Sequence, residues 1–210
     1  NILDYKFVRS KHDEVTAFRE KYQLKERFWL YVAHYYTHKN HKNLLLAYSS
    51  LKKIAPNSLK LVLRGDGLAE NPEILGIIDR LDLSSDITFL PRLESDELPH
   101  LYSSADALIF PSLYEGGGIP IMEAMACGCP VVANNTSGLR DSCQDKKTGL
   151  LYKYNDLEDA ASKIKFILND SKLNNQLVDN GLEWASSFSW LKNSDQMFQF
   201  INQSMDKHIK

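Results

Sequence analysis

The sequence predicts an α/β protein: a Rossmann-like, doubly wound parallel sheet of about six strands, followed by a helical C-terminal tail. Short apolar runs alternate with helical segments of ten or so residues, which is typical of this architecture. The chain has 210 residues, enough to bury a sizeable core, and no linker, low-complexity stretch or internal repeat divides it. We therefore expect one such domain.

The expected strands are short apolar runs that end in polar or glycine-rich loops. In chain order they lie within residues 27–36, 58–67, 86–91, 105–111, 129–138 and 148–152, the fifth ending in a polar loop. The expected helices lie within residues 13–24, 41–55, 71–83, 94–105 and 118–128, and the pattern is helical from Asp156 to the end. Pro56 stops the second helix.

Ligands of such sheets bind beyond the carboxyl ends of the strands. Candidate chemistry is therefore expected in the loops 33–42, 64–68, 90–93 and 112–119.

Composition excludes several classes of function. The formal net charge is −2 and 25% of the residues are charged, so neither nucleic acid nor an anionic membrane is expected as the main partner. No apolar run is long enough to span a membrane, and the first residues lack a secretory signal. The three cysteines, Cys127, Cys129 and Cys143, have no metal or disulfide spacing. Reduced thiols and a cytoplasmic location are expected.

The glycine pair after the second strand allows two interpretations. Gly65-Asp66-Gly67 begins like a dinucleotide fingerprint, but Glu70 stands where the third glycine belongs. A tight strand-to-helix turn that uses the conformational freedom of glycine is the favoured interpretation. A phosphate-binding P-loop motif is absent, and no Asp-x-Asp pair offers a divalent metal site.

The loop after the first strand, "HYYTHKNHKN", is rich in histidine and lysine. Its histidines match no ordinary zinc spacing and have no acidic ligand among them. Two interpretations stay open: a solvated basic loop, or an anion site in which cations and free N–H groups at a helix start bind phosphate.

The segment "YEGGGIPIMEAMACGCP" predicts a helix that begins close to Gly118 and ends at Gly128. Proline at position 120 suits the first helical turn, and the glycines before it let a ligand approach the helix N-terminus, which carries a partial positive charge. Glu115 precedes this helix and Glu123 lies in its early turns. By itself, Glu115 also fits a polar loop residue without a ligand. Glu123 also fits a carboxylate that simply stabilises the start of the helix.

Taken together, these elements resemble the C-terminal half of a GT-B glycosyltransferase, in the retaining glycosyl transferases group 1 family. The resemblance covers nearly the whole chain, in order: "NILDYKF", "LYVAHYYTHKNHKNLLLAY", "LVLRGDG", "LYSSADALIFPSLYEGGGIPIMEAMACGCPVVANNTSGLRD", "TGLLY" and the terminal "FSW" helix. It implies a donor-binding domain over residues 13–188, an interdomain linker remnant over 1–12 and a C-terminal helix over 189–210. An acceptor-binding N-terminal domain would be absent from this chain.

The resemblance also implies roles for individual residues. Glu115 would face the hydroxyl groups of the donor sugar, and Glu123 would accept hydrogen bonds from the ribose. Lys39 would bind the diphosphate and, with Glu115, contribute to catalysis. The remaining implied donor-binding residues are His34 and Gly65, then Leu90 and Arg92 at the nucleobase, and the glycine loop Gly116, Gly117, Gly118 and Ile119.

Two positions depart from the family pattern. His34 stands where the family usually has arginine, so the diphosphate has one fixed positive charge fewer. Gly117 replaces a large aromatic residue, which implies a wider sugar pocket or a looser loop.

The implied reaction is transfer of a sugar from a nucleoside-diphosphate sugar to an acceptor hydroxyl with retention, without metal or cofactor. A UDP-sugar is the default donor and a GDP-sugar the alternative; the acceptor would be a glycan or a lipid-linked sugar in polysaccharide, lipopolysaccharide or glycolipid synthesis. The isolated chain would bind donor but turn over little, and its absent domain would provide any peripheral attachment to the inner face of the membrane. A non-catalytic sugar-nucleotide or interaction domain, and a GT-B epimerase or phosphorylase relative, remain as alternatives.

Overall fold

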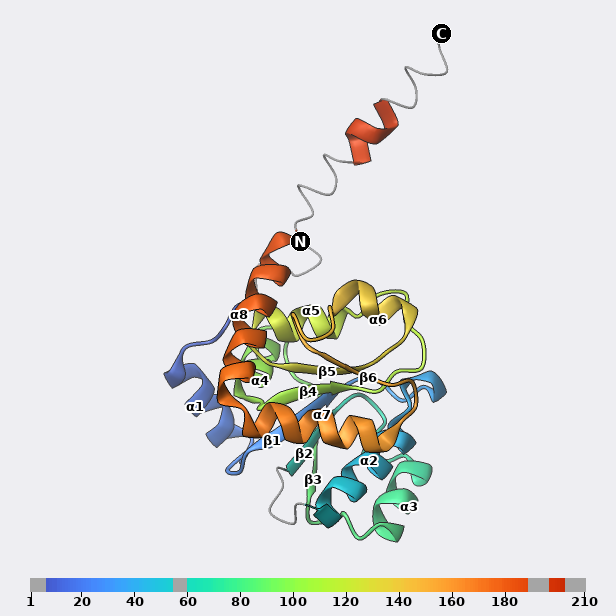
Figure 1. The fold of residues 1–210 in the computed structure, drawn as a ribbon. Coiled ribbons are helices and arrows are strands. Elements are labelled where there is room, and N and C mark those ends of the chain that lie inside the picture. The colour runs from blue at the N-terminus through green and yellow to red at the C-terminus, as the bar shows by residue number, and fades with distance from the viewer. Residues whose placement is uncertain (1–6, 55–59, 189–196, 203–210) are drawn as a thin grey trace.

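The computed structural model describes residues 7–54, 60–188 and 197–202. Within them six strands form one parallel sheet in the order β3-β2-β1-β4-β5-β6 (Figure 1). The strands are β1 (Phe28–Val32), β2 (Lys60–Arg64), β3 (Ile87–Leu90), β4 (Ala107–Phe110), β5 (Val131–Asn134) and β6 (Leu150–Tyr152). The predicted fold class is confirmed.

Helices cover both faces of this sheet. They are α1 (His12–Lys21), α2 (His41–Ile54), α3 (Pro72–Arg80), α4 (Leu98–Ser104), α5 (Ile119–Ala126), α6 (Ser137–Ser142), α7 (Leu157–Asn169) and α8 (Ser171–Ser187), with a 3₁₀ turn η1 (Thr37–Lys39). α2, α3 and α7 lie on one face, whereas α4 and α5 lie on the other (Figure 1). α8 packs beside both α7 and α5.

The strand order reverses between β1 and β4. These neighbours pair in register, with Trp29 opposite Ala107 and Leu30 opposite Leu108. The chain leaves β1 toward α2 on one face and leaves β4 toward α5 on the other (Figure 1). In a doubly wound sheet the loops diverge at such a point and open a crevice, which is where ligands bind.

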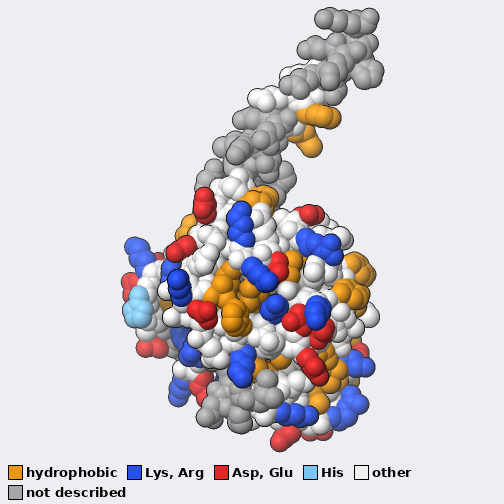
Figure 2. Space-filling view, in the orientation of Figure 1, with side chains coloured by type: hydrophobic (Ala, Val, Ile, Leu, Met, Phe, Trp, Pro, Cys, Tyr) orange, Lys and Arg blue, Asp and Glu red, His pale blue; other side chains and the backbone are white. Residues whose placement is uncertain are grey.

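The central strands β1 and β4 form the middle of the hydrophobic core. Trp29, Leu30 and Tyr31 of β1 and Leu108 of β4 are fully buried. Strands covered on both faces need apolar residues at successive positions, which explains the unbroken apolar runs of the sequence. On the surface shown in Figure 2, positive and negative side chains are interspersed.

The first strand is shorter than the predicted 27–36. It ends at Val32, opposite Arg64, because β2 turns away directly afterward. A Cβ atom on Gly65 would lie 1.8 Å from the carbonyl oxygen of Ala33, so only glycine allows the two backbones to approach there. Gly67 adopts a φ of +76°, and the favoured tight-turn interpretation of this segment is confirmed.

Two helical predictions differ from the structure. The predicted helix over 94–105 is limited to α4, because residues 95–97 form a turn before it. The polar loop expected after the fifth strand contains α6, whose sequence "SGLRDS" has little helical pattern. The helix from Gly118 to Gly128 is confirmed as α5, with Gly128 beyond its end at a φ of +71°.

Some predictions fall on residues outside the described ranges. These residues are 1–6 of the linker, Pro56 after the second helix, and 189–196 and 203–210 of the terminal helix. Residues 197–202 are helical. α1 begins at His12, at the end of the segment that resembles a linker, and packs on α4. In the described parts of the chain, no helix is both long and apolar enough to cross a membrane.

Candidate functional site

The two loops at the strand-order reversal bring Lys39 and Glu115 together. Lys39 Nζ donates to Glu115 Oε1 at 2.5 Å, and the two side chains are only 17% and 12% exposed. The ammonium also lies 5.6 Å from the ring centroid of Phe110, at the end of β4. Two residues that are 76 positions apart in sequence therefore form an ion pair in the crevice.

Hydrogen bonds hold both loops in place. The hydroxyl of Tyr31 donates to the carbonyl of Lys39 at 2.6 Å, and the N–H of Leu113 donates to the carbonyl of His38 at 2.8 Å. The buried side chain of Asn40 donates to the carbonyl of Pro111 at 3.0 Å. These bonds join the loop after β1 to the loop after β4, so the ion pair has a fixed backbone on both sides.

The glycine loop before α5 divides into an open part and a packed part. A Cβ atom at Gly116 or Gly117 would meet nothing within 4 Å, so the space at both positions is open. The N–H of Gly118 donates to Ser142 Oγ of α6 at 3.0 Å, and the N–H of Ile119 donates to the carbonyl of Gly117. A ligand at this helix start would have to replace those two bonds.

Glu123 lies one turn into α5 with a different partner. The hydroxyl of the fully buried Tyr102 in α4 donates to Glu123 Oε2 at 2.8 Å. Burial raises the pKa of Glu123, and the bond from Tyr102 opposes that rise because it stabilises the ionised form. The other carboxylate oxygen, Oε1, has no protein donor among the recorded hydrogen bonds of the described residues.

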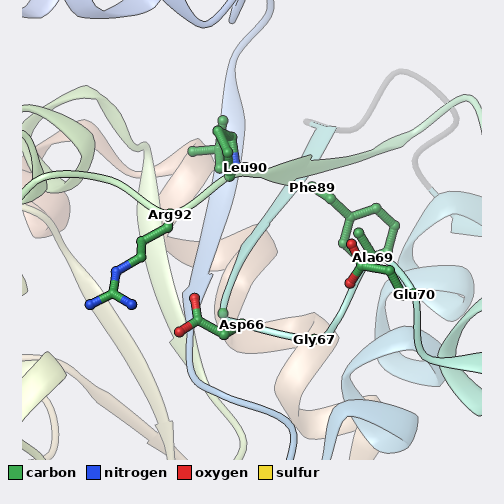
Figure 3. A pocket seen from close by; sticks show the side chains of 9 residues that line it. Asp66, Gly67, Ala69, Glu70, Phe89, Leu90 and Arg92 are labelled. Atoms are coloured by element: carbon green, nitrogen blue, oxygen red, sulfur yellow. The ribbon is translucent and has the colours of Figure 1, made fainter.

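A cavity of about 470 Å³ opens beyond the carboxyl ends of β2 and β3 (Figure 3). The predicted residues Gly65, Leu90 and Arg92 line it together. Its remaining lining residues are Asp66, Gly67, Ala69, Glu70, Phe89 and Pro91. Lys39, Glu115 and Glu123 lie outside this lining.

His34 is tied to the turn after β2 rather than to Lys39. Its Nδ1 accepts the N–H of Asp66 at 3.2 Å, so a neutral imidazole carries its proton on Nε2. The carboxylate of Asp66 lies 3.8 Å from the same ring and 3.7 Å from Arg64 Nη1. His34 is 54% exposed, whereas Arg64 is only 13% exposed.

The three histidines of the loop after β1 diverge. His38 stacks between Tyr36 and Tyr114, with ring centroids 5.8 and 4.7 Å away. His41 is buried beside Tyr31, and this burial lowers its pKa to about 4. Among the described residues, no three His, Cys, Asp or Glu side chains come together as a metal-binding group.

The comparison with protein families covers the domain just described. The model of the glycosyl transferases group 1 family matches residues 14–184. The chain belongs to this family. The match spans the sheet, the glycine loop and the ion pair, and ends within α8.

Known relatives are about one third identical to the chain over the aligned residues. The O-antigen chain mannosyltransferase B of Escherichia coli is 33% identical over 172 residues, which are 81% of this chain and 45% of that protein. The D-inositol 3-phosphate glycosyltransferase of Mycolicibacterium smegmatis is 32% identical over 144 residues, 69% of this chain and 33% of that protein. The chain spans less than half the length of these relatives.

Solved structures share the fold. Sucrose-phosphate synthase from Thermosynechococcus elongatus superposes with a TM-score of 0.81 at 29% identity, covering 96% of this chain and 51% of the other. HepE of Anabaena, solved with UDP-glucose, superposes with a TM-score of 0.83 at 21% identity. The match covers 96% of this chain and 56% of the HepE chain. The C-terminal domain of a group 1 protein from Francisella tularensis matches with a TM-score of 0.74 at 21% identity, covering 88% and 97%.

The sequence predictions for this group 1 domain name neither Tyr102 nor Ser142, and they include Arg64 only as part of the candidate loop 64–68. Arg64 ends β2, and its Nη1 lies 3.7 Å from the carboxylate of Asp66 in the cavity lining. Tyr102 and Ser142 contact Glu123 and Gly118 from α4 and α6. Neither had a local signal, because each acts across 21 or 24 residues of chain.

Proposed function

We propose that this chain is the donor-binding half of a glycosyltransferase that takes a nucleoside-diphosphate sugar. The observation that carries the proposal is the meeting of Lys39 and Glu115 at the strand-order reversal, in a chain of the group 1 family. Lys39 would bind the diphosphate, and Glu115 would accept hydrogen bonds from the sugar hydroxyls.

The nucleoside would extend from this crevice along the carboxyl edge of the sheet. The base would occupy the cavity at Leu90 and Arg92, and Glu123 would accept hydrogen bonds from the ribose. The free Oε1 of Glu123 supports this role, because one carboxylate oxygen is already held by Tyr102. Donors to an ionised carboxylate make strong hydrogen bonds.

In the proposed reaction a sugar moves to an acceptor hydroxyl with retention of configuration. Departure of the nucleoside diphosphate develops negative charge on its phosphates. Lys39 and the N-terminus of α5 would stabilise that charge, which is an electrostatic contribution that requires no metal or cofactor. Glu115 and Lys39 are therefore the proposed catalytic residues of this half.

The acceptor site is proposed to belong to residues outside this chain, because the chain spans less than half of its curated relatives. UDP is the proposed donor nucleotide, with GDP as the alternative, and the UDP-glucose complex of HepE supports the first. Among the relatives, the O-antigen chain mannosyltransferase supports the proposed role in polysaccharide, lipopolysaccharide or glycolipid synthesis.

The test is calorimetric titration of the chain with UDP, GDP and ADP and with UDP-glucose, GDP-mannose and ADP-glucose. At least one nucleotide should bind with a dissociation constant below the millimolar range. Glu123→Ala should raise the dissociation constant of that nucleotide about tenfold, since a hydrogen bond to a charged group is lost.

The matched control is Glu20→Ala, which removes an exposed glutamate from α1. It should leave binding unchanged. Absence of binding by all six compounds at millimolar concentration would refute the donor-site proposal for this chain.

A further inference from the structure

The Lys39–Glu115 ion pair has a consequence for which ligands the site accepts. Both groups are largely removed from solvent, at 17% and 12% exposure, and their atoms are 2.5 Å apart. The Coulomb attraction between two charges in such a position is stronger than on the surface, because water screens it less.

The backbone geometry shows that this pair is built into the two loops. The Tyr31 hydroxyl fixes the carbonyl of Lys39, as described above. On the other side, Gly138 of α6 packs against Glu115, where a Cβ atom would lie 1.9 Å from the carbonyl oxygen of Glu115. Neither side chain requires a backbone movement to reach the other.

A diphosphate that binds Lys39 must therefore compete with a carboxylate already in place. The free nucleoside diphosphate brings only further negative charge toward Glu115, and like charges at short range are unfavourable. A nucleotide sugar differs, because its hydroxyl groups can donate to the Glu115 carboxylate when Lys39 turns to the phosphate. The same carboxylate thus opposes one ligand and supports the other.

We propose that Glu115 is a built-in competitor for Lys39 that selects nucleotide sugars over free nucleoside diphosphates. The inference rests on the proposed function of this site. It extends that function, because the glutamate would also favour release of the nucleoside diphosphate after the sugar has left. As the nucleoside diphosphate leaves, the Lys39–Glu115 ion pair would form again and replace the contact between lysine and phosphate.

The test is the substitution Glu115→Gln, which keeps the shape of the side chain and removes its charge. UDP, GDP and ADP, and the three sugar nucleotides named above, are titrated into both proteins. Any diphosphate that binds the unsubstituted chain should bind Glu115→Gln about tenfold more tightly, since the opposing charge is gone. The corresponding sugar nucleotide should gain nothing or bind more weakly, so the preference between the two ligands is lost.

Two further variants keep the result interpretable. Glu123→Gln removes the carboxylate of α5, which receives the Tyr102 hydroxyl rather than a cation, and it should weaken the binding of both diphosphates and sugar nucleotides. Glu115→Ala replaces Glu115→Gln if the latter fails to give a cooperative thermal transition, and the same tightening is expected.

Diphosphate affinity that stays equal or falls in the Glu115 variants would overturn the inference while leaving the donor site intact. Absence of nucleotide binding by the unsubstituted chain is a different outcome, because it refutes the proposed function and the inference with it.

Discussion

The two glutamates on either side of the α5 N-terminus are the same residue type in opposite environments. Glu115 faces the ammonium of Lys39 across the crevice between β1 and β4. Glu123 is half-buried against α4 and receives only the neutral hydroxyl of Tyr102, so burial raises its pKa. In the proposed site, the partner of each carboxylate would therefore decide how it responds to a diphosphate: Glu115 would compete for Lys39, and Glu123 would accept from the ribose.

This difference follows from where each residue lies in the fold. Glu115 belongs to a loop at the strand-order reversal, where loops from two helical layers meet and the ammonium of Lys39, in the loop after β1, is within reach. Glu123 is part of the regular helix α5, beside the hydroxyl of Tyr102 in α4 and the buried thiol of Cys127. Only the first position can recruit a partner from across the sheet.

The largest expected effect comes from removing the cation. Lys39→Met leaves Glu115 buried without its partner, which should lower the free energy of unfolding by about 3 kcal/mol. UDP affinity should fall by about 100-fold, because a buried charged contact is lost. Thermal unfolding and calorimetry measure both quantities. Lys25→Met, at an exposed position after α1, is the control and should change neither.

A smaller effect should follow from Tyr102→Phe, and it should depend on pH. Loss of the hydroxyl removes the bond that stabilises ionised Glu123, so the pKa of this carboxyl rises further above its ordinary value. In the proposed site, the ribose hydroxyls donate to the ionised form of Glu123. Nucleotide affinity should therefore fall at a higher pH than in the unsubstituted chain as the solution is acidified, and should match it at alkaline pH.

Among the described residues, the titratable groups that face Glu123 are Tyr102 from α4 and Cys127 just beyond the end of α5, which makes this titration specific. The thiol of Cys127 stays protonated because burial raises its pKa to about 12. A uniform loss of affinity at every pH would indicate that Tyr102 acts only on packing.

The smallest effect concerns the backbone between the two glutamates. Ser142→Ala removes the acceptor of the Gly118 N–H and should cost about 1 kcal/mol of unfolding free energy. It also frees that N–H for a phosphate at the helix start, so UDP should bind about twofold more tightly. Weaker UDP binding would mean that Ser142 positions the loop rather than competing for its N–H.

The sequence predicted the sheet and α5 because these depend on local patterns. Apolar runs mark the strands, and Pro120 and Gly128 mark the ends of the helix. The resemblance to the group 1 family named both glutamates and Lys39 as site residues. It assigned each of them a ligand contact and left their contacts with one another undetermined.

The contacts that were missed cross long stretches of chain. The Lys39–Glu115 pair and the bond from Tyr102 depend on side-chain directions that only the packed sheet and helices define. Helix α6 was missed because its six residues contain one large apolar side chain, Leu139, and so carry almost no periodicity, yet it supplies Ser142 and Gly138 to the glycine loop. Local patterns cannot report such long-range support.

The packing around the triple glycine also indicates where this domain can be re-engineered. Side chains introduced at Gly116 and Gly117 would project into open space beside Glu115, at ordinary backbone angles. A side chain at Gly118 would meet Ile121 at 2.9 Å, and one at Gly138 would collide with the backbone. A mutant library aimed at altered sugar preference should therefore randomise the first two glycines and keep the other two constant.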